Sequence, residues 1–335
     1  MHHRIAPLLS ALLLTIACDG GQADAKKTDA KKTETKKAET AETKKTETAE
    51  AKADDVKGKV EGDAKAGEAG ESEEAKKAKE EQERKDRLVK ALADLEEWKT
   101  KEAARWDEAL EGEVQTLVST EFEDAKAAIA AAVAGKHRHP DNTARDPYRH
   151  PAETLAFLGL EPTMTVIEVG PGWGWYTELL APVLARSGKL EVTTFDPKGP
   201  EDQGGTLYAR RFEAFAARSE AAYGKIERLL QTPDAPLELG PDGSADMVFI
   251  VRGLHGWVNR GQLDANLAKV HAALRPGGIA AVVQHRAKDD AKAEESAKQG
   301  YLPQAWVVEK FEGAGFTLEE ASEINANPKD TKDYP

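Results

Sequence analysis

Cysteine is nearly absent from this 335-residue chain: Cys18 is the only one, so no intramolecular disulfide can form. Long apolar runs are lacking too, and none reaches the roughly 18 residues that a membrane-spanning helix requires. Dense basic segments with interleaved aromatic residues are also missing, and the formal net charge is -13. Because nucleic acid binding depends on such basic surfaces, nucleic acid is not expected as a partner.

A short apolar run, residues 5–17, lies near the amino terminus and follows Arg4. Its 13 residues are too few to span a bilayer and match a signal-peptide h-region, so residues 1–17 are predicted to be a signal peptide. The order Thr-Ile-Ala before Cys18 resembles a bacterial lipoprotein site, although threonine stands where such sites usually have leucine. We expect an exported protein of the cell envelope, anchored to a membrane on its periplasmic side by a lipid on Cys18. The alternative is an ordinary signal peptide that happens to end at a cysteine.

Residues 18–85 are dominated by Lys-Lys-Thr, Ala-Glu-Thr and similar units. From residue 22 to residue 85 there is no aromatic side chain, and there are only two valines. Such a composition cannot bury enough apolar surface to form a core. We therefore predict a disordered, low-complexity tether.

Residues 86–134 have a different pattern, in which apolar residues recur at mostly three- and four-residue steps. This spacing predicts an amphipathic helical arm, with a break near Gly112. The apolar stripe is expected to pack on the globular domain, and a coiled coil with a second chain is the alternative. The stripe consists of Leu88, Leu92, Leu95, Ala103, Trp106, Leu110, Val114 and Leu117.

Helix and strand signals alternate through residues 135–335, after a polar linking segment, 135–151, that should be irregular. Such alternation is typical of a parallel sheet with helices on both faces, so we predict an α/β domain with a Rossmann-like sheet. The predicted strands are 165–169, 189–195, 226–230, 245–251, 279–284 and 316–324, and the predicted helices are 153–160, 175–185, 261–274 and 301–313.

Three glycines alternate with other residues between the first predicted strand and the helix after it. They remove side chains where the backbone must turn sharply, and they let an adenosyl group approach the amino end of that helix. Asp196, at the end of the second strand, can bind both ribose hydroxyls of a nucleotide. Asp234 follows the third strand and places a second carboxylate near the adenine. The glycines are Gly170, Gly172 and Gly174.

The order of these motifs resembles that of class I S-adenosylmethionine-dependent methyltransferases. The resemblance rests on 168–174, Asp196, Asp234, 242–248 and the Leu-Arg-Pro-Gly-Gly segment at 274–278. That last segment is more typical of methyltransferases than of dehydrogenases. The resemblance implies S-adenosylmethionine as the cofactor, bound by Glu168, Gly170, Gly172, Gly174, Asp196 and Asp234.

Residues 132–335 resemble one group of predicted bacterial methyltransferases more closely than they resemble class I methyltransferases in general. The substrates of this group are largely undefined. Gly170 and Trp173 depart from this group, which tends to have tryptophan and glycine at these two positions. Class I sheets end with an antiparallel seventh strand, and members of the group continue past the segment at 322–330 into it, whereas this sequence stops at Pro335. Either the sheet lacks this strand or the sequence is truncated, and the sixth strand is then expected at an exposed edge. The shared motifs are at 144–151, 171–178, Arg252 with His255 and Trp257, 285–286, and 322–330.

Methyl transfer is an in-line displacement, so the enzyme must hold the acceptor in line with the methyl group. His255 and His285 follow the fourth and fifth strands, at the edge where open α/β sheets bind ligands. They are the candidate catalytic residues, as base or as acceptor-positioning groups, and structural hydrogen-bonded histidines are the alternative for both. No two histidines have the spacing of metal ligands on a helix, and no metal is predicted.

Five further residues are candidates for acceptor binding. Arg149, Arg252 and Arg286 would bind an acidic acceptor, or would only pair with carboxylates near the cofactor. Tyr148 and Trp257 would wall an apolar or aromatic pocket.

The sequence predicts an exported protein that transfers a methyl group from S-adenosylmethionine to an unidentified acceptor. The acceptor is a small molecule or another, unknown kind of molecule. A non-catalytic lipoprotein that binds a nucleoside-like or other small ligand is the alternative. A nicotinamide-dependent oxidoreductase is a third hypothesis, and the sequence indicates no oligomeric state.

Overall fold

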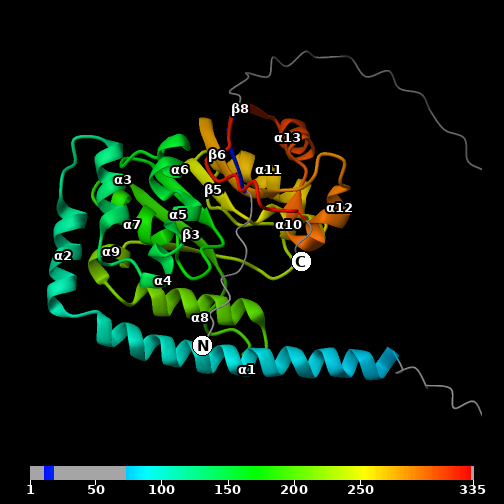
Figure 1. Ribbon diagram of the computed structural model, residues 1–335, viewed down its shortest axis with the longest axis horizontal. Coiled ribbons are helices and arrows are strands. Elements are labelled where there is room, and N and C mark those ends of the chain that lie inside the picture. Colours follow the sequence, from blue (N-terminus) through cyan, green and yellow to red (C-terminus); the bar gives the residue numbers. More distant parts are fainter. Residues whose placement is uncertain (1–10, 19–72, 333–335) are drawn as a thin grey trace, which may run out of the picture. The chain divides into compact units, whose positions relative to one another are not determined.

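The computed structural model describes residues 11–18 and 73–332 (Figure 1). Residues 1–10 of the predicted signal peptide and residues 19–72 of the predicted tether lie outside the described residues. The chain divides into two compact units, residues 1–20 with 82–335 and residues 21–81. The sheet and the candidate site belong to the first unit. Of the second unit only residues 73–81, in helix α1 (Glu73–Arg105), are described.

A mixed sheet forms the centre of the larger unit (Figure 1). Its strands are β1 (Ala11–Cys18), β2 (Thr165–Val169), β3 (Lys189–Thr194), β4 (Glu227–Leu230), β5 (Ala245–Val251), β6 (Leu274–Arg286), β7 (Tyr301–Leu302) and β8 (Phe316–Ser322). The strand order is β4-β3-β2-β5-β6-β1-β8, and β7 pairs with β6. All pairs are parallel except those that β1 makes with β6 and β8. The predicted parallel α/β sheet is therefore confirmed.

The strand order reverses between β2 and β5. The chain builds β2, β3 and β4 toward one edge and then returns to build β5 and β6 on the other side of β2. Open α/β sheets bind ligands beyond the carboxyl ends of their strands at such a reversal. The glycine loop follows β2 and Arg252 follows β5, so the topology brings both to this crevice.

Alternate strand residues enter two separate apolar cores. In β5, Met247 and Phe249 belong to one core, and Val248 and Ile250 to the other. The first core is covered by α2 (Glu108–Ser119), α3 (Ala125–Ala134), α6 (Pro151–Phe157), α7 (Thr177–Leu184), α8 (Gly204–Ala216) and α9 (Glu220–Tyr223). The second is covered by α10 (Leu254–Asn259), α11 (Leu263–Ala273), α12 (Ala293–Ser296) and α13 (Gln304–Gly313). Helices thus cover both faces of the sheet, as predicted (Figure 1).

The predicted helical arm consists of three helices, α1, α2 and α3, and the breaks between them do not lie at Gly112, where a break is predicted. Helix α1 begins at Glu73, 13 residues before the predicted start at residue 86, and Gly112 lies inside α2. The new helices begin where aspartates cap them: Asp107 accepts a hydrogen bond from the backbone N–H of Leu110, and Asp124 caps α3 in the same way. A single exposed glycine costs a helix only about 1 kcal/mol, which a packed helix can absorb.

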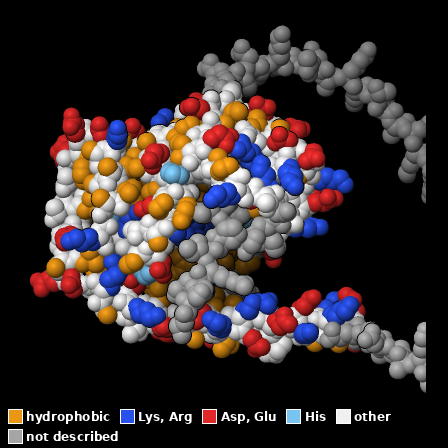
Figure 2. Space-filling model, in the orientation of Figure 1, with side chains coloured by type: hydrophobic (Ala, Val, Ile, Leu, Met, Phe, Trp, Pro, Cys, Tyr) orange, Lys and Arg blue, Asp and Glu red, His pale blue; other side chains and the backbone are white. Residues whose placement is uncertain are grey.

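The arm packs on the domain, as its apolar stripe predicts. Leu95 of α1 is buried, and Leu110, Val114 and Val118 of α2 belong to the first core. The outer surface of α1 carries alternating acidic and basic side chains (Figure 2), and pairs such as Lys90 with Asp94, 3.0 Å apart, stabilise it locally. In the described part of the chain, no helix is both long and apolar enough to cross a lipid bilayer.

Strand β1, blue in Figure 1, fills the place of the missing seventh strand. It lies between β6 and β8, with Ala11 opposite His285 and Cys18 opposite Phe316. The sequence predicts a signal peptide here and no strand, because an apolar run of this kind suits either structure. β8 is an edge strand, as expected, but the expectation that the sheet lacks a strand beside it is wrong, because β1 lies there. Cleavage before Cys18 would remove residues 11–17, seven of the eight residues of β1, so the strand requires an unprocessed chain.

Candidate active site

A pocket of about 220 Å³ opens beside the glycine loop, between the carboxyl end of β3 and helix α8. Gly170 and Gly172 have positive φ angles of 66° and 60°, and no atom lies within 4 Å of the place where a Cβ would stand. The backbone N–H of Gly170 donates to the Thr193 hydroxyl at 2.8 Å, which fixes the loop on β3. The two glycines therefore leave open space on the pocket side. The pocket is lined by Gly170, Pro171, Gly172, Thr193, Thr194, Phe195, Tyr208 and Phe212.

Packing alone is enough to require glycine at position 174. A Cβ on Gly174 would stand 2.6 Å from Cζ of Phe215, which is fully buried, and φ at this position is +75°. Gly174 does not line the pocket. Glycine is needed at this position because the loop approaches α8 closely. The sequence pattern does not predict this helix.

Glu168 is buried at the carboxyl end of β2, where its carboxylate accepts a hydrogen bond from the Thr177 hydroxyl at 2.6 Å. Burial raises the pKa of Glu168 to about 7, although the Thr177 hydrogen bond opposes this. Glu168 does not line the pocket, and its contact with Thr177 ties the end of β2 to the start of α7.

Asp196 and Asp234 lie at the ends of the two neighbouring strands, and both are exposed. Asp196 accepts a hydrogen bond from the backbone N–H of Lys198 at 2.8 Å, in a turn directly after β3. Asp234 adopts a left-handed conformation, with φ +61°, which costs a non-glycine residue about 1–2 kcal/mol. Neither aspartate lines the glycine-loop pocket, and both stand at the same edge of the sheet.

Trp173 joins the glycine loop to the helical arm. Its ring centroid is 5.6 Å from that of Trp98 in α1, and the Arg211 guanidinium lies 4.5 Å from the centroid of the Trp173 ring. The residue that departs from the sequence pattern therefore has a partner on the arm. Contacts of this kind contribute about 0.5–1.5 kcal/mol beyond area burial.

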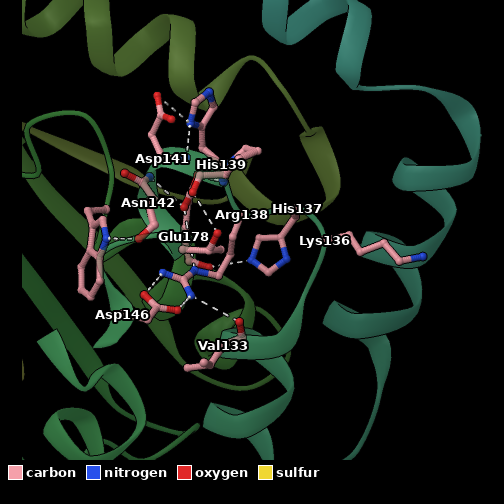
Figure 3. Close-up of polar contacts among 12 residues, drawn as sticks. Val133, Lys136, His137, Arg138, His139, Asp141, Asn142, Asp146 and Glu178 are labelled. Atoms are coloured by element: carbon pink, nitrogen blue, oxygen red, sulfur yellow. Dashed lines mark hydrogen bonds and ion pairs between the residues drawn. The ribbon is translucent and has the colours of Figure 1, made fainter. Parts of the chain in front are cut away.

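The linking segment is held on helix α7 by a buried carboxylate, Glu178 (Figure 3). Glu178 accepts hydrogen bonds from the backbone N–H of His139 at 3.0 Å and from the amide of Asn142 at 2.9 Å. Burial raises the pKa of Glu178. The segment, predicted to be irregular, forms two short helices, α4 (Pro140–Thr143) and α5 (Asp146–Arg149), because these contacts fix its backbone.

Arg149 and Arg252 lie at the carboxyl edge, on α5 and directly after β5. The Arg149 guanidinium stands 4.5 Å from the centroid of the Trp175 ring, and Arg252 has a left-handed backbone with φ +51°. Tyr148, at the surface, is 44% exposed. Arg286 differs from the other two arginines because its guanidinium pairs with Glu323 and donates to Gln304 at 3.0 Å.

Trp257 is 3% exposed and belongs to the second apolar core. The structure therefore gives it a core position, not a place in the wall of a pocket. The Arg-x-x-His-x-Trp motif predicts Trp257 as a residue of the acceptor pocket. The spacing of the motif does not reveal which side of a short helix faces the core.

The two histidines differ in their surroundings. His255 on α10 is partly buried, and burial is the main reason that its pKa is lowered; the side chain of Gln284 opposes this shift. Its Nδ1 atom is buried and has no hydrogen bond. His285 is buried at the end of β6, with its ring centroid 5.7 Å from that of Tyr301. Among the described residues, no group of three or more His, Cys, Asp and Glu side chains is arranged to hold a metal ion.

Six pocket residues were not predicted as site residues: Pro171, Thr193, Thr194, Phe195, Tyr208 and Phe212. The two threonines lie inside a predicted strand. The strand pattern predicts that they are buried, but it does not predict that they line a site. Tyr208 and Phe212 are four residues apart on α8, and this spacing is the only sequence signal for them.

The fold is a Rossmann-like α/β fold, in which a largely parallel sheet carries a glycine loop at the reversal of strand order. No protein-family model and no curated protein matches this sequence.

Several solved structures are similar to it, among them S-adenosylmethionine-dependent methyltransferases. One from Aquifex aeolicus shares 20% identity, with 60% of this chain and 92% of that chain covered and a TM-score of 0.40. An O-methyltransferase family protein from Burkholderia thailandensis shares 20% identity over 58% and 56% of the chains, with a TM-score of 0.38. Human N-acetylserotonin methyltransferase in complex with S-adenosylmethionine shares 15% identity over 59% and 55%, with a TM-score of 0.36. These values show similarity of the fold alone.

Proposed function

We propose that this protein transfers a methyl group from S-adenosylmethionine to an acceptor. The observation that carries the proposal is the pocket at the glycine loop, where Gly170 and Gly172 leave the backbone open to a ligand beside the end of β3. Phe195, Tyr208 and Phe212 give this pocket apolar walls that suit an adenine ring. Asp196, exposed just beyond β3, would accept hydrogen bonds from the ribose hydroxyls.

The chain's own residues would orient the acceptor and receive its proton. When bound, S-adenosylmethionine supplies an electrophilic methyl group. Displacement at that methyl needs an acceptor whose lone pair is free and in line. The lowered pKa of His255 keeps its ring neutral at neutral pH, and a neutral imidazole can accept a proton from a protonated acceptor. Glu168 and Thr177 hold the loop and the start of α7 in place around the site.

Two substitutions separate binding from turnover. Asp196→Ala should weaken S-adenosylhomocysteine binding about tenfold or more, because a ribose contact is lost, whereas His255→Ala should leave binding unchanged and lower turnover. Binding is measured by calorimetry, and turnover by the release of S-adenosylhomocysteine in cell-envelope extract, with mass spectrometry to identify the methylated product. Asp264→Ala, which removes another exposed carboxylate, is the control. Equal loss of binding in the Asp196 and His255 variants would refute this division of roles.

We also propose that Cys18 is lipidated after export and that the tether links the anchor to the domain. The proposal is supported by the short apolar run before Cys18, and it requires that β1 be lost on processing. A labelled fatty acid should enter the wild-type protein in bacterial cells but not Cys18→Ser, and the mature mass should correspond to a chain that starts at Cys18. Equal labelling of both, or a mature chain that keeps residues 11–17, would overturn it.

A further inference from the structure

Three arginines meet near the crevice beyond β5. Arg145 directly precedes α5, Arg149 ends that helix, and Arg252 follows β5. Their charges act on one another: the pKa of Arg149 is lowered first by burial and then by Arg252 and Arg145, and the pKa of Arg252 is lowered by burial and then by Arg145. Arginine nevertheless keeps its proton at neutral pH, so the three guanidinium groups repel one another.

The acidic side chain on α5 that acts on Arg149 already has another partner. Asp146 lies on the same short helix as Arg149, but both of its carboxylate oxygens accept hydrogen bonds from Arg138, one of them at 2.8 Å (Figure 3). The charges that act most strongly on Arg252 include no carboxylate. Arg286, by contrast, is paired with Glu323. Among the described residues Arg286 thus has an ion-pair partner, whereas Arg149 and Arg252 form no ion pair and the charge of Asp146 offsets that of Arg149 only in part. Arg149 and Arg252 are called the uncompensated arginines below.

The two uncompensated arginines are held in place by other contacts. The Trp175 ring under Arg149 is fixed by its indole N–H, which donates to the backbone carbonyl of Asn142 at 3.0 Å. The strained backbone of Arg252 is held by its N–H, which donates to the carbonyl of Val283 at 2.7 Å. Strained residues of this kind collect at functional sites, because folding would otherwise avoid their cost. Protein surrounds both side chains closely enough to lower their pKa, yet Arg252 and Arg149 each keep solvent-accessible surface, so a ligand can reach both.

We propose that Arg149 and Arg252 bind the anionic group, a carboxylate or a phosphate, of the methyl acceptor. This inference rests on the proposed function, since it names the chemical class of the substrate. Guanidinium groups bind such oxyanions with paired hydrogen bonds. None of the three arginines lines the glycine-loop pocket, and Arg252 lies close enough to His255 to influence its charge. The anion site is therefore on the side of the candidate base, where the acceptor belongs, and not on the adenosyl side.

The test uses the 335-residue chain saturated with S-adenosylhomocysteine, so that the carboxylate of the cofactor product already occupies its own subsite. Phenyl phosphate and benzoate are the anionic probes, benzyl alcohol is the neutral probe, and binding is followed by calorimetry. We expect both anions, but not the alcohol, to bind the wild-type complex. Arg149→Gln and Arg252→Gln should each weaken anion binding at least tenfold, while Arg252→Lys, which keeps the charge, should weaken it less.

Arg186→Gln is the control variant, because it removes the same charge from an arginine paired with Glu121 at 2.7 Å, away from the crevice. It should bind the anions as the wild type does, and circular dichroism melts establish that each variant is folded. The inference is overturned if neither anion binds the wild-type complex, or if the Arg149 and Arg252 variants bind anions unchanged. It is also overturned if these variants lose S-adenosylhomocysteine to the same extent, because the arginines then serve the cofactor. Failure of the wild type to bind S-adenosylhomocysteine refutes the proposed function instead.

Discussion

Arg218→Met is expected to lower the free energy of unfolding by about 3–5 kcal/mol, because it leaves two buried carboxylates without their shared partner. Arg218 is 3% exposed and donates to Glu102 of α1 at 2.9 Å and to Glu178 of α7 at 3.1 Å. Burial raises the pKa of Glu102, but the hydrogen bonds from Arg105 and Arg218 outweigh it and the net shift is downward. Urea unfolding followed by circular dichroism at pH 7.5 measures the loss.

The same variant should lose less stability at pH 5. Burial already raises the pKa of Glu178 and the charge of Arg218 is the main opposing influence, so without Arg218 the folded variant binds more protons than the unfolded chain and its stability falls as the pH increases. Arg228→Met is the matched control, because Arg228 pairs with Glu213 at 3.1 Å on a partly exposed surface, where an ion pair contributes about 1 kcal/mol at most. Similar losses in the two variants, or a loss from Arg218→Met that does not change with pH, would contradict this account of the buried network.

Gly174→Ala is expected to destabilise the protein by about 2–5 kcal/mol. The left-handed backbone costs alanine about 1–2 kcal/mol, and a methyl group driven into a packed core costs about 1–3 kcal/mol more. The added Cβ would stand 2.6 Å from Cζ of Phe215, a side chain with no exposed surface that cannot move aside. Urea unfolding measures this effect as well.

Gly172→Ala is the comparison, because its φ of +60° carries the same backbone cost but its added methyl group meets no atom within 4 Å. We expect a loss of only about 1–2 kcal/mol, together with at least tenfold weaker binding of S-adenosylhomocysteine by calorimetry, because the methyl group enters the space on the pocket side. If Gly172→Ala bound the ligand normally, or if it were the more destabilised of the two, the glycines would not have the separate roles assigned to them.

The strands were the most predictable part of the fold. β2 and β5 begin and end at the predicted residues, since a parallel strand buried on both faces is a continuous apolar run bounded by polar residues. The helical arm was less predictable. New helices begin at the capping aspartates Asp107 and Asp124, and the apolar periodicity of the arm does not indicate these breaks. Helix α8 was not predicted, and its first two residues are glycines, which weaken any helix signal.

The candidate site was predictable where a motif has a local cause. Gly170 and Gly172 can be recognised from the sharp turn after a strand, and they do line the pocket. Contacts between distant segments could not be read in the same way: Glu102 and Arg218 are 116 residues apart, and nothing in either segment indicates the other. For the same reason the sequence does not reveal that Asp146 is engaged by Arg138 or that Arg286 is paired, and these contacts distinguish the uncompensated arginines from the paired one.

Calorimetric titration of the 335-residue chain with S-adenosylhomocysteine tests the central claim most directly. Binding at one site per chain is expected, with competition by S-adenosylmethionine and no binding of NAD. The absence of binding by either adenosyl compound, or binding of NAD alone, would contradict the account.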